Sequence, residues 1–214
     1  MATFKLVIFD MDGTLLKGRT IFVFAHKKGF MNELLNIINS DRKSYEKSIE
    51  IAKLLKGMNS RELLEIFRGI PLQDYVETVI KELKEKNIKT AIITNSYQFV
   101  ADDLKERLGI DYAFANNLII DDDIVTGELL VNNKNLAEQF DGCNIHSICK
   151  EQVLKSICIK LDITEGEAIA VGDGAIDICM LKKAGLGIAF NASEKVQKHA
   201  DINTGDMRII LTHI

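Results

Sequence analysis

The sequence predicts an α/β protein built on a doubly wound parallel sheet, with a small helical domain inserted near its amino end. Short apolar runs of strand length alternate with amphipathic helical segments over most of the 214 residues, which is typical of parallel strands joined by crossover helices. Acidic residues directly follow two of these runs, and a long helical stretch separates the first run from the others. We therefore expect a core domain of residues 1–15 and 72–214 and an inserted helical domain of residues 16–71.

The first strand is expected at the run FKLVIF, which is followed by Asp10, Asp12, Gly13 and Thr14. Ligand sites in open α/β sheets lie at the carboxyl ends of the strands, where this acid pair stands. Two neighbouring carboxylates in an apolar setting repel each other unless a proton or a cation intervenes, and Mg2+ is a hard cation that prefers oxygen ligands. One Asp can then act as a nucleophile and the other as a general acid and base. The structural alternative is an Asp-Gly turn in which the acid only caps the strand end.

Residues 20–67 are expected to be almost entirely helical. Apolar residues recur at helical spacing in the segment 43–56, and the segment SRELLEIF begins with Ser60 as an expected N-cap. The only proline, Pro71, precedes another amphipathic segment at 72–87, as expected where one structural unit gives way to the next. Lys and Arg exceed Asp and Glu between residues 15 and 70. This excess would attract anionic substrates, or it only solvates the outer faces of helices.

The remainder of the core alternates between strands and helices. The expected strands are 89–94, 112–115, 167–172 and 186–190, and the expected helices are 97–108, 148–161 and the segments that lead to the carboxyl terminus. A hairpin at 118–131 is expected to project from the sheet, with residues 121–123 in its turn rather than in a calcium loop. The strand that ends at Gly172 is followed by Asp173 and, one turn later, by Asp177, which form a second acid pair.

Composition and charge argue against several other classes of protein. The net charge of −4 provides no general basic surface for nucleic acid. No segment approaches the roughly 20 apolar residues of a membrane helix, and the amino end lacks the pattern of a secretory signal. We expect a cytoplasmic protein without membrane or nucleic-acid partners, either a monomer or a homodimer. Cysteine and histidine spacing matches no zinc site or disulfide framework, so we expect reduced thiols at Cys143, Cys149, Cys158 and Cys179 and packing or surface roles for His26, His146, His199 and His213.

Several polar residues fall at the ends of elements of this one predicted sheet. They are Asp10, Asp12, Thr94, Lys150, Asp173 and Asp177. Phosphoryl transfer to a carboxylate needs a nucleophilic oxygen, a metal ion that bridges nucleophile and phosphate, and donors around the other phosphate oxygens. Each of these needs has a candidate here, since a threonine hydroxyl and a lysine can bind phosphate and the second acid pair can complete a metal site. The sequence therefore predicts a phosphoryl-transfer centre.

The motifs DMDGT (10–14), IITN (92–95), Lys150 and GDGAID (172–177) resemble the four motifs of the haloacid dehalogenase superfamily. Their order and spacing, the helical insertion after the first motif, and the segment LGIDYAFANNL (108–118) are similar to its phosphoserine phosphatase branch. The resemblance covers nearly the whole chain. It implies a Rossmann-like core with a helical cap domain, and a Mg2+-dependent phosphatase that acts on a small phosphorylated metabolite.

The resemblance also implies a role for each matched residue. Asp10 would become phosphorylated, and Asp12 would protonate the leaving alcohol and then activate the hydrolytic water. Mg2+ would be bound by Asp10, the main-chain carbonyl of Asp12 and Asp173, and Asp177 would support these ligands without touching the metal. The phosphate-binding residues would be Thr94, Asn95 and Lys150.

Four departures from the family pattern concern the substrate. Arg19 stands where phosphoserine phosphatases have a Glu that receives the ammonium group of serine, and Ala52 falls at the place of the arginine that binds the serine carboxylate. Ile176 replaces an Asn in the last motif, and residues 94–96 replace a Ser and two glycines in the second. We predict that phosphoserine is a poor substrate and that Arg19 faces an anionic or hydroxyl-rich group of another small phosphomonoester. The alternative for Arg19 is an exposed lid residue.

Two other functions use the same residues. A phosphotransferase would form the same aspartyl-phosphate but pass the phosphoryl group to an alcohol instead of water. A catalytically silent protein would bind a phosphorylated ligand without turning it over, and Ile176 with the altered second motif is the feature that favours it.

Overall fold

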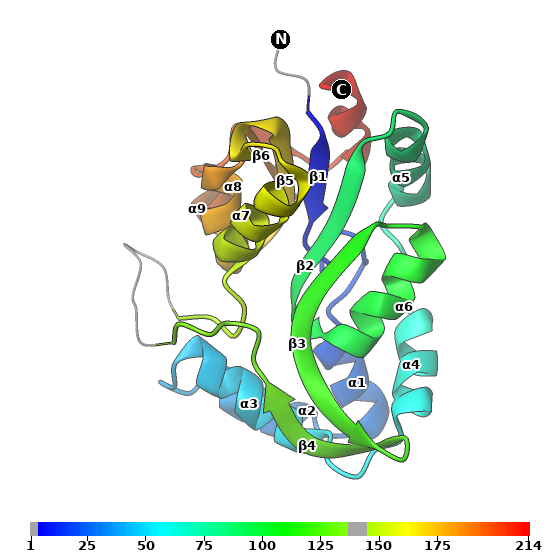
Figure 1. The fold of residues 1–214 in the computed structure, drawn as a ribbon. Helices are drawn as coiled ribbons and strands as arrows, with labels where there is room; N and C mark the ends of the chain where they lie inside the picture. Colours follow the sequence, from blue (N-terminus) through cyan, green and yellow to red (C-terminus); the bar gives the residue numbers. More distant parts are fainter. Residues whose placement is uncertain (1–3, 137–144) are drawn as a thin grey trace.

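The structure, a computed structural model, describes residues 4–136 and 145–214 and has a seven-stranded sheet in the order β4-β3-β2-β1-β5-β6-β7. The strands are β1 (Leu6–Phe9), β2 (Lys89–Tyr97), β3 (Tyr112–Asp121), β4 (Ile124–Leu130), β5 (Ala168–Gly172), β6 (Leu186–Phe190) and β7 (Ile202–Thr204). Neighbouring strands pair in parallel, except that β3 and β4 pair antiparallel at one edge. The amino-terminal strand β1 lies in the middle of the sheet (Figure 1).

Helices cover both faces of the sheet, which confirms the doubly wound α/β class. The helices are α1 (Thr20–Lys28), α2 (Met31–Ile38), α3 (Ser44–Leu54), α4 (Ser60–Arg68), α5 (Val76–Glu85), α6 (Gln98–Leu108), α7 (Lys150–Leu161), α8 (Ile178–Lys183) and α9 (Glu194–Gln197). Leu6 and Ile8 of β1 pack with α7, α8 and α9, whereas Val7 and Phe9 pack with α5, α6 and the terminal 3-10 helix η3 (Met207–Thr212). Because both faces are covered, β1 is apolar at every position.

Helices α1–α4 follow β1 and lie toward the carboxyl ends of the parallel strands (Figure 1). The two chain connections to this helical unit run side by side, since the Lys17 amide donates to the Pro71 carbonyl at 2.8 Å and the Gln73 amide donates to the Leu15 carbonyl at 2.8 Å. Phe24 and other buried residues of these helices join the apolar cluster on the α5 and α6 face of the sheet. The domain boundaries near residues 16 and 71 stay a prediction, which these paired connections support.

The hairpin of β3 and β4 projects from the sheet as expected and contacts the helical unit. Its turn contains Asp122 and Asp123, whose φ angles are 44° and 64°. The Gly57 amide donates to the Val125 carbonyl at 2.8 Å, and the Ser60 amide donates to the Asp123 carbonyl at 2.7 Å. Main-chain hydrogen bonds therefore hold the hairpin against the loop between α3 and α4.

Three local expectations were wrong. The N-cap of α4 is Asn59 rather than Ser60, because the Asn59 side chain accepts from the amides of Arg61 and Glu62. Strand β3 does not stop at residue 115 but continues into the hairpin as one strand of 10 residues. The short strand β7 lies in the carboxyl-terminal region that we expected to be helical.

Three other features of the described residues bear on expectations from the sequence. No helix there is both long and apolar enough to cross a membrane. Cys158 is buried and Cys149 is half-buried, neither in a disulfide, while Cys143 lies outside the described residues. His146 Nδ1 lies 2.8 Å from Ser44 Oγ, which is the packing role expected for a histidine here. The cytoplasmic location and the monomeric or dimeric state stay predictions.

Candidate active site

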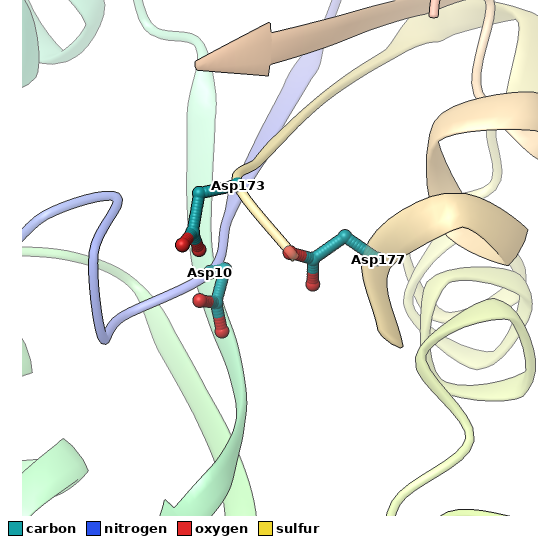
Figure 2. A group of neighbouring side chains, drawn as sticks. All are labelled: Asp10, Asp173 and Asp177. Carbon is teal, nitrogen blue, oxygen red and sulfur yellow. The ribbon is translucent and has the colours of Figure 1, made fainter. Parts of the chain in front are cut away.

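Three carboxylates meet at the carboxyl end of the central strands. Asp10 directly follows β1, Asp173 directly follows β5, and Asp177 ends the 3-10 turn η2 (Ala175–Asp177). Each side chain has an oxygen that lies within 4.8 Å of an oxygen of the others, and Figure 2 shows the three groups directed toward one another. Since β1 and β5 are neighbours in the sheet, their parallel pairing brings these segments together.

Lys150, the first residue of α7, enters the same cluster from the face of the sheet that α7 and α8 cover. Its side chain is completely buried, and its ammonium group pairs with Asp10 Oδ1 and lies 2.6 Å from Asp177 Oδ1. Burial alone lowers the pKa of Lys150, but the two carboxylates outweigh this and raise it above its ordinary value. Lys150 is therefore a permanent cation inside the site.

Burial and mutual repulsion disfavour the ionised forms of the clustered carboxyl groups. Burial raises the pKa of Asp10 well above its usual range, Lys150 opposes the shift, and Asp177 and Asp173 add to it. Burial and Asp177 likewise raise the pKa of Asp173, although Arg19 and Lys150 partly compensate. An arrangement of three carboxylates with one buried lysine favours an additional cation.

Asp12 lies beside this cluster but makes different contacts. Its Oδ1 accepts from the Thr20 amide at 3.0 Å and from the Thr20 hydroxyl at 2.5 Å, at the start of α1. Burial raises the pKa of Asp12 to about 6, and the two Thr20 hydrogen bonds oppose this shift. A carboxyl group with this pKa gains and loses a proton near neutral pH, as a general acid and base must. Thr20 is a supporting residue that the sequence analysis missed.

Thr94 and Asn95 differ in their exposure. Thr94 lies within β2. Its side chain is completely buried, and its hydroxyl oxygen accepts from the Ser96 amide at 3.2 Å. Asn95 is exposed, and its main-chain carbonyl accepts from the Asn116 side chain at 2.8 Å. The irregular pairing of β2 and β3 between Ile93 and Tyr97 lets this segment leave the sheet ladder. Their phosphate-binding roles stay predictions.

Arg19 lies next to the acidic cluster. Its guanidinium Nη2 is 3.6 Å from Asp173 Oδ2, and 59% of its side chain is exposed. Thr14 also approaches Asp173, with its hydroxyl 3.4 Å from Oδ1. A specificity role for Arg19 stays a prediction, because the contact that the structure gives it is with a carboxylate of the protein.

Two glycines let the acidic residues approach so closely. A Cβ atom at Gly172 would lie 2.5 Å from the Asp177 side chain, and one at Gly13 would lie 2.5 Å from Asp173 Oδ2. Gly13 also has a φ of +93°, which disfavours other residues. The close packing of the acidic side chains therefore requires glycine at positions 13 and 172.

The donor set suits a hard divalent cation such as Mg2+. Carboxylate oxygens are its preferred protein ligands, and Asp10, Asp173 and Asp177 each have an oxygen within 4.8 Å of the others. The Asp12 carboxylate is not part of this group and is held by Thr20. That finding is compatible with a ligand role for the Asp12 main-chain carbonyl, which stays a prediction together with the supporting role of Asp177.

A small cavity of about 80 Å³ lies beside Asp12, between the core and the helical unit. It is lined by Asp12, Ile21, Ser48, Ile51, Asn95, Ser96, Tyr97 and Leu129. Most of these residues were missed, because apolar positions on amphipathic segments are interpreted first as packing positions. The spacing of Ser48 and Ile51, three residues apart on α3, is the one signal that they share a helix face.

Comparison with protein families identifies the chain. Residues 4–185 match the family described as haloacid dehalogenase-like hydrolase, which is most of the sequence and includes all four motifs. The chain belongs to the haloacid dehalogenase-like hydrolases. Within this hydrolase family it is similar to phosphoserine phosphatases, and it is a phosphatase.

The similarity extends over the full length of some relatives of this hydrolase. It is 33% identical to phosphoserine phosphatase of Methanocaldococcus jannaschii, over 98% of this chain and 97% of the relative. It is also 33% identical to phosphoserine phosphatase of Archaeoglobus fulgidus, but there it covers 92% of this chain and spans only 55% of the relative. A solved structure described as a phospho-aspartyl intermediate analogue of phosphoserine phosphatase has a TM-score of 0.83, with 32% identity and 99% of each chain covered.

Proposed function

We propose that this phosphatase is a Mg2+-dependent phosphomonoesterase that hydrolyses a small phosphorylated metabolite through an aspartyl-phosphate at Asp10. The observation that carries the proposal is the position of Asp10, a buried carboxylate at the end of the central strand that contacts Lys150 and converges with Asp173 and Asp177. The likeness to a structure described as a phospho-aspartyl intermediate analogue supports it.

The first half of the reaction is a transfer to Asp10. An oxygen of the Asp10 carboxylate forms a bond to phosphorus while the bond from phosphorus to the alcohol oxygen breaks. The protonated Asp12 gives its proton to the leaving alcohol. Lys150, Thr94 and the amides near Asn95 bind the equatorial phosphate oxygens.

The second half is hydrolysis of the acyl-phosphate. Asp12, now ionised, takes a proton from a water molecule, whose oxygen forms a bond to phosphorus as the bond to Asp10 breaks. Phosphate leaves, and both carboxyl groups return to their starting states. Mg2+ bound by Asp10, Asp173 and the Asp12 carbonyl would lower the charge repulsion between the carboxylates and the phosphate.

Arg19 contributes to substrate choice in this proposal. A guanidinium group next to Asp173 repels an ammonium group, so it disfavours phosphoserine, and its exposed side chain is available to an anionic or hydroxyl-rich group. Ala52 is completely buried and has no charge to offer a carboxylate. Both features support low activity on phosphoserine.

Phosphate release by the purified protein with Mg2+, over a panel of small phosphomonoesters that includes phosphoserine, tests the proposal. We expect turnover of at least one member, loss of that turnover in Asp10→Asn, and lower kcat/KM for phosphoserine than for that member. Binding without turnover would favour the silent protein. Products that carry the phosphoryl group on an added alcohol would favour the phosphotransferase.

A further inference from the structure

The cavity beside Asp12 is lined by side chains from the core, from the helical unit and from the hairpin. Tyr97 comes from the end of β2 in the core, Ile21 from α1, Ile51 from α3, and Leu129 from the hairpin strand β4. The alcohol that leaves during the reaction must be next to Asp12, because Asp12 protonates it in the proposed mechanism. This cavity is therefore where the carbon part of the substrate fits.

Among the residues that the structure describes, the lining of the cavity carries no cationic side chain and only one carboxyl group, that of Asp12. Its walls are the apolar side chains of Ile21, Ile51 and Leu129, with polar groups from Ser48, Asn95, Ser96 and Tyr97. A carboxylate placed in this space would find no opposite charge, and an unpaired buried charge is strongly disfavoured. The Arg19 guanidinium pairs with Asp173 and does not line the cavity.

An ammonium group would also be disfavoured, although Asp12 is close. Thr20 donates both hydrogen bonds that the Asp12 carboxylate accepts within the described residues, and both go to Oδ1. Two cations of the protein, Arg19 beside Asp173 and Lys150 on Asp10, lie close enough to act on Asp12, so they repel an ammonium group placed next to it. The cavity therefore favours an uncharged group.

Apart from Asp12 and Asn95, the polar side chains that line the cavity are hydroxyls, those of Ser48, Ser96 and Tyr97. Burial raises the pKa of Tyr97, and the Asp12 charge raises it further, so that its phenol remains a hydrogen-bond donor. The Ser48 hydroxyl lies 3.1 Å from Ser147 Oγ and 3.3 Å from the Ser44 carbonyl, so its proton has an acceptor in the protein and its oxygen can accept from a group in the cavity. These groups can bind a substrate hydroxyl without any charge.

Resting on the proposed function, we propose that the natural substrates are phosphomonoesters of short, uncharged alcohols whose carbon chain is apolar or carries a hydroxyl. The volume of about 80 Å³ limits the chain length. Because about 10–15 Å³ of such space holds one water molecule, a space of about 80 Å³ holds several water-sized groups. A chain of a few carbon atoms fits this space.

Matched substrates test the inference in the wild-type enzyme with Mg2+. n-Propyl phosphate and O-phosphoethanolamine have alcohols of nearly the same size, one uncharged and one with an ammonium group, and phosphoglycolate carries a carboxylate instead. We expect kcat/KM for n-propyl phosphate to exceed those for the two charged substrates and for phosphoserine by about tenfold or more. The ammonium group makes its alcohol the better leaving group, so intrinsic reactivity alone predicts the opposite order.

Acetyl phosphate, whose leaving group needs no proton from Asp12, separates the two possible failures. Turnover of acetyl phosphate together with a preference for O-phosphoethanolamine, phosphoglycolate or phosphoserine would overturn the inference and leave the phosphatase proposal standing. A preference for phosphoglycolate in particular would support an anionic group opposite Arg19. No turnover of any compound, acetyl phosphate included, would overturn the proposed function itself.

A variant that adds a charge to the cavity gives a second test. Ser48→Asp should raise the ratio of kcat/KM for O-phosphoethanolamine to that for n-propyl phosphate by about fivefold or more, because it supplies an opposite charge to the ammonium group. The matched control is Ser156→Asp, the same change at an exposed position on α7. An unchanged ratio in a Ser48→Asp enzyme with the melting temperature of the control would contradict the assignment of this cavity.

Discussion

Lys150 shows how one residue couples the stability of the site to its chemistry. Its buried ammonium group contacts Asp10, the proposed nucleophile, and Asp177, the later residue of the second acid pair. The sequence predicted Lys150 as a phosphate-binding residue, but its pairing with Asp177 was not predictable. The contact depends on how α7 and η2 pack on neighbouring parts of the sheet, which no local pattern encodes.

Replacing Lys150 by Met should lower the free energy of unfolding by about 3–5 kcal/mol, because removal of one partner leaves uncompensated buried charges. Urea denaturation at pH 7 without metal measures the loss. The double variant Lys150→Met/Asp177→Asn should recover part of the lost free energy of unfolding, since one of the two carboxylates that paired with Lys150 is then replaced by a neutral amide. Equal stability of the single and double variants would contradict this account of the ion pairs.

Asp12 should make stability depend on pH. Its pKa is about 6 in the folded state against an ordinary value of 3.8, so the folded protein holds this proton more tightly. Stability is therefore lost as the pH rises from about 4 to about 6 and stays lower above this window. Asp12→Asn avoids the ionisation. Its melting temperature in EDTA should exceed that of the wild type by a few degrees at pH 8 and by little at pH 4.

The comparison must include Asp10, whose pKa is raised as well and which titrates in both proteins. Because Asp10 is present in both, its contribution cancels in the difference between the two melting temperatures to a first approximation. A difference that stays constant from pH 4 to pH 8 would show that Asp12 is not perturbed in the way its burial implies.

At the scale of elements, the end of β5 fixes the geometry of the acidic cluster. Gly172 closes the strand directly against Asp177, whose Oδ2 accepts from the Gly174 amide at 2.8 Å. The second acid pair was predicted correctly at this strand end. Glycine is needed at position 172 because the missing Cβ makes room for Asp177 itself.

Gly172→Ala should lower the free energy of unfolding by about 1–3 kcal/mol through overpacking and should also reduce kcat, because it displaces Asp177 from Lys150. Thermal denaturation and the rate of phosphate release measure the two effects. Gly166→Ala is the matched control, since a Cβ there meets nothing closer than 3.6 Å. If the two alanine variants behave alike, the close contact with Asp177 is not what requires glycine.

Strand β3 shows why some elements could not be predicted. The polar residues Asn116 and Asn117 interrupt its apolar pattern, so the sequence suggested a short strand and a separate hairpin. In the structure Asn116 is completely buried and hydrogen bonded to the Asn95 carbonyl and the Ser147 hydroxyl. A buried polar residue that is satisfied by distant parts of the chain leaves no local signal.

At the scale of the whole molecule, the sequence was most informative about the core sheet and its acidic ends. The runs before Asp10 and Asp173 are continuous and apolar because both faces of the sheet are covered, so their strands were predictable. The substrate cavity was not, since its walls come from β2, α1, α3 and the hairpin. Its composition depends on how the helical unit and the hairpin lie over the core.

Mg2+ should stabilise the whole fold by neutralising the acidic cluster. A ligand at 100 times its Kd adds about 2.7 kcal/mol to the free energy of unfolding, and about 1 kcal/mol shifts the melting temperature of a protein of this size by roughly 2–4 °C. We therefore expect saturating Mg2+ to raise the melting temperature by several degrees relative to EDTA at the same ionic strength. An Asp173→Asn variant should lose most of this shift, and an equal shift in that variant would remove Asp173 from the metal site.

The most direct test of the central claim is the chemical identity of the phosphorylated residue. Acid quenching of the enzyme during turnover of a substrate found in the panel, followed by peptide mass spectrometry, locates any trapped phosphoryl group. The account predicts one phosphoryl group on Asp10, lost when the quench is delayed until the substrate is exhausted and never formed by Asp10→Asn. A phosphoryl group on another residue, or phosphate release by Asp10→Asn at the wild-type rate, would contradict it.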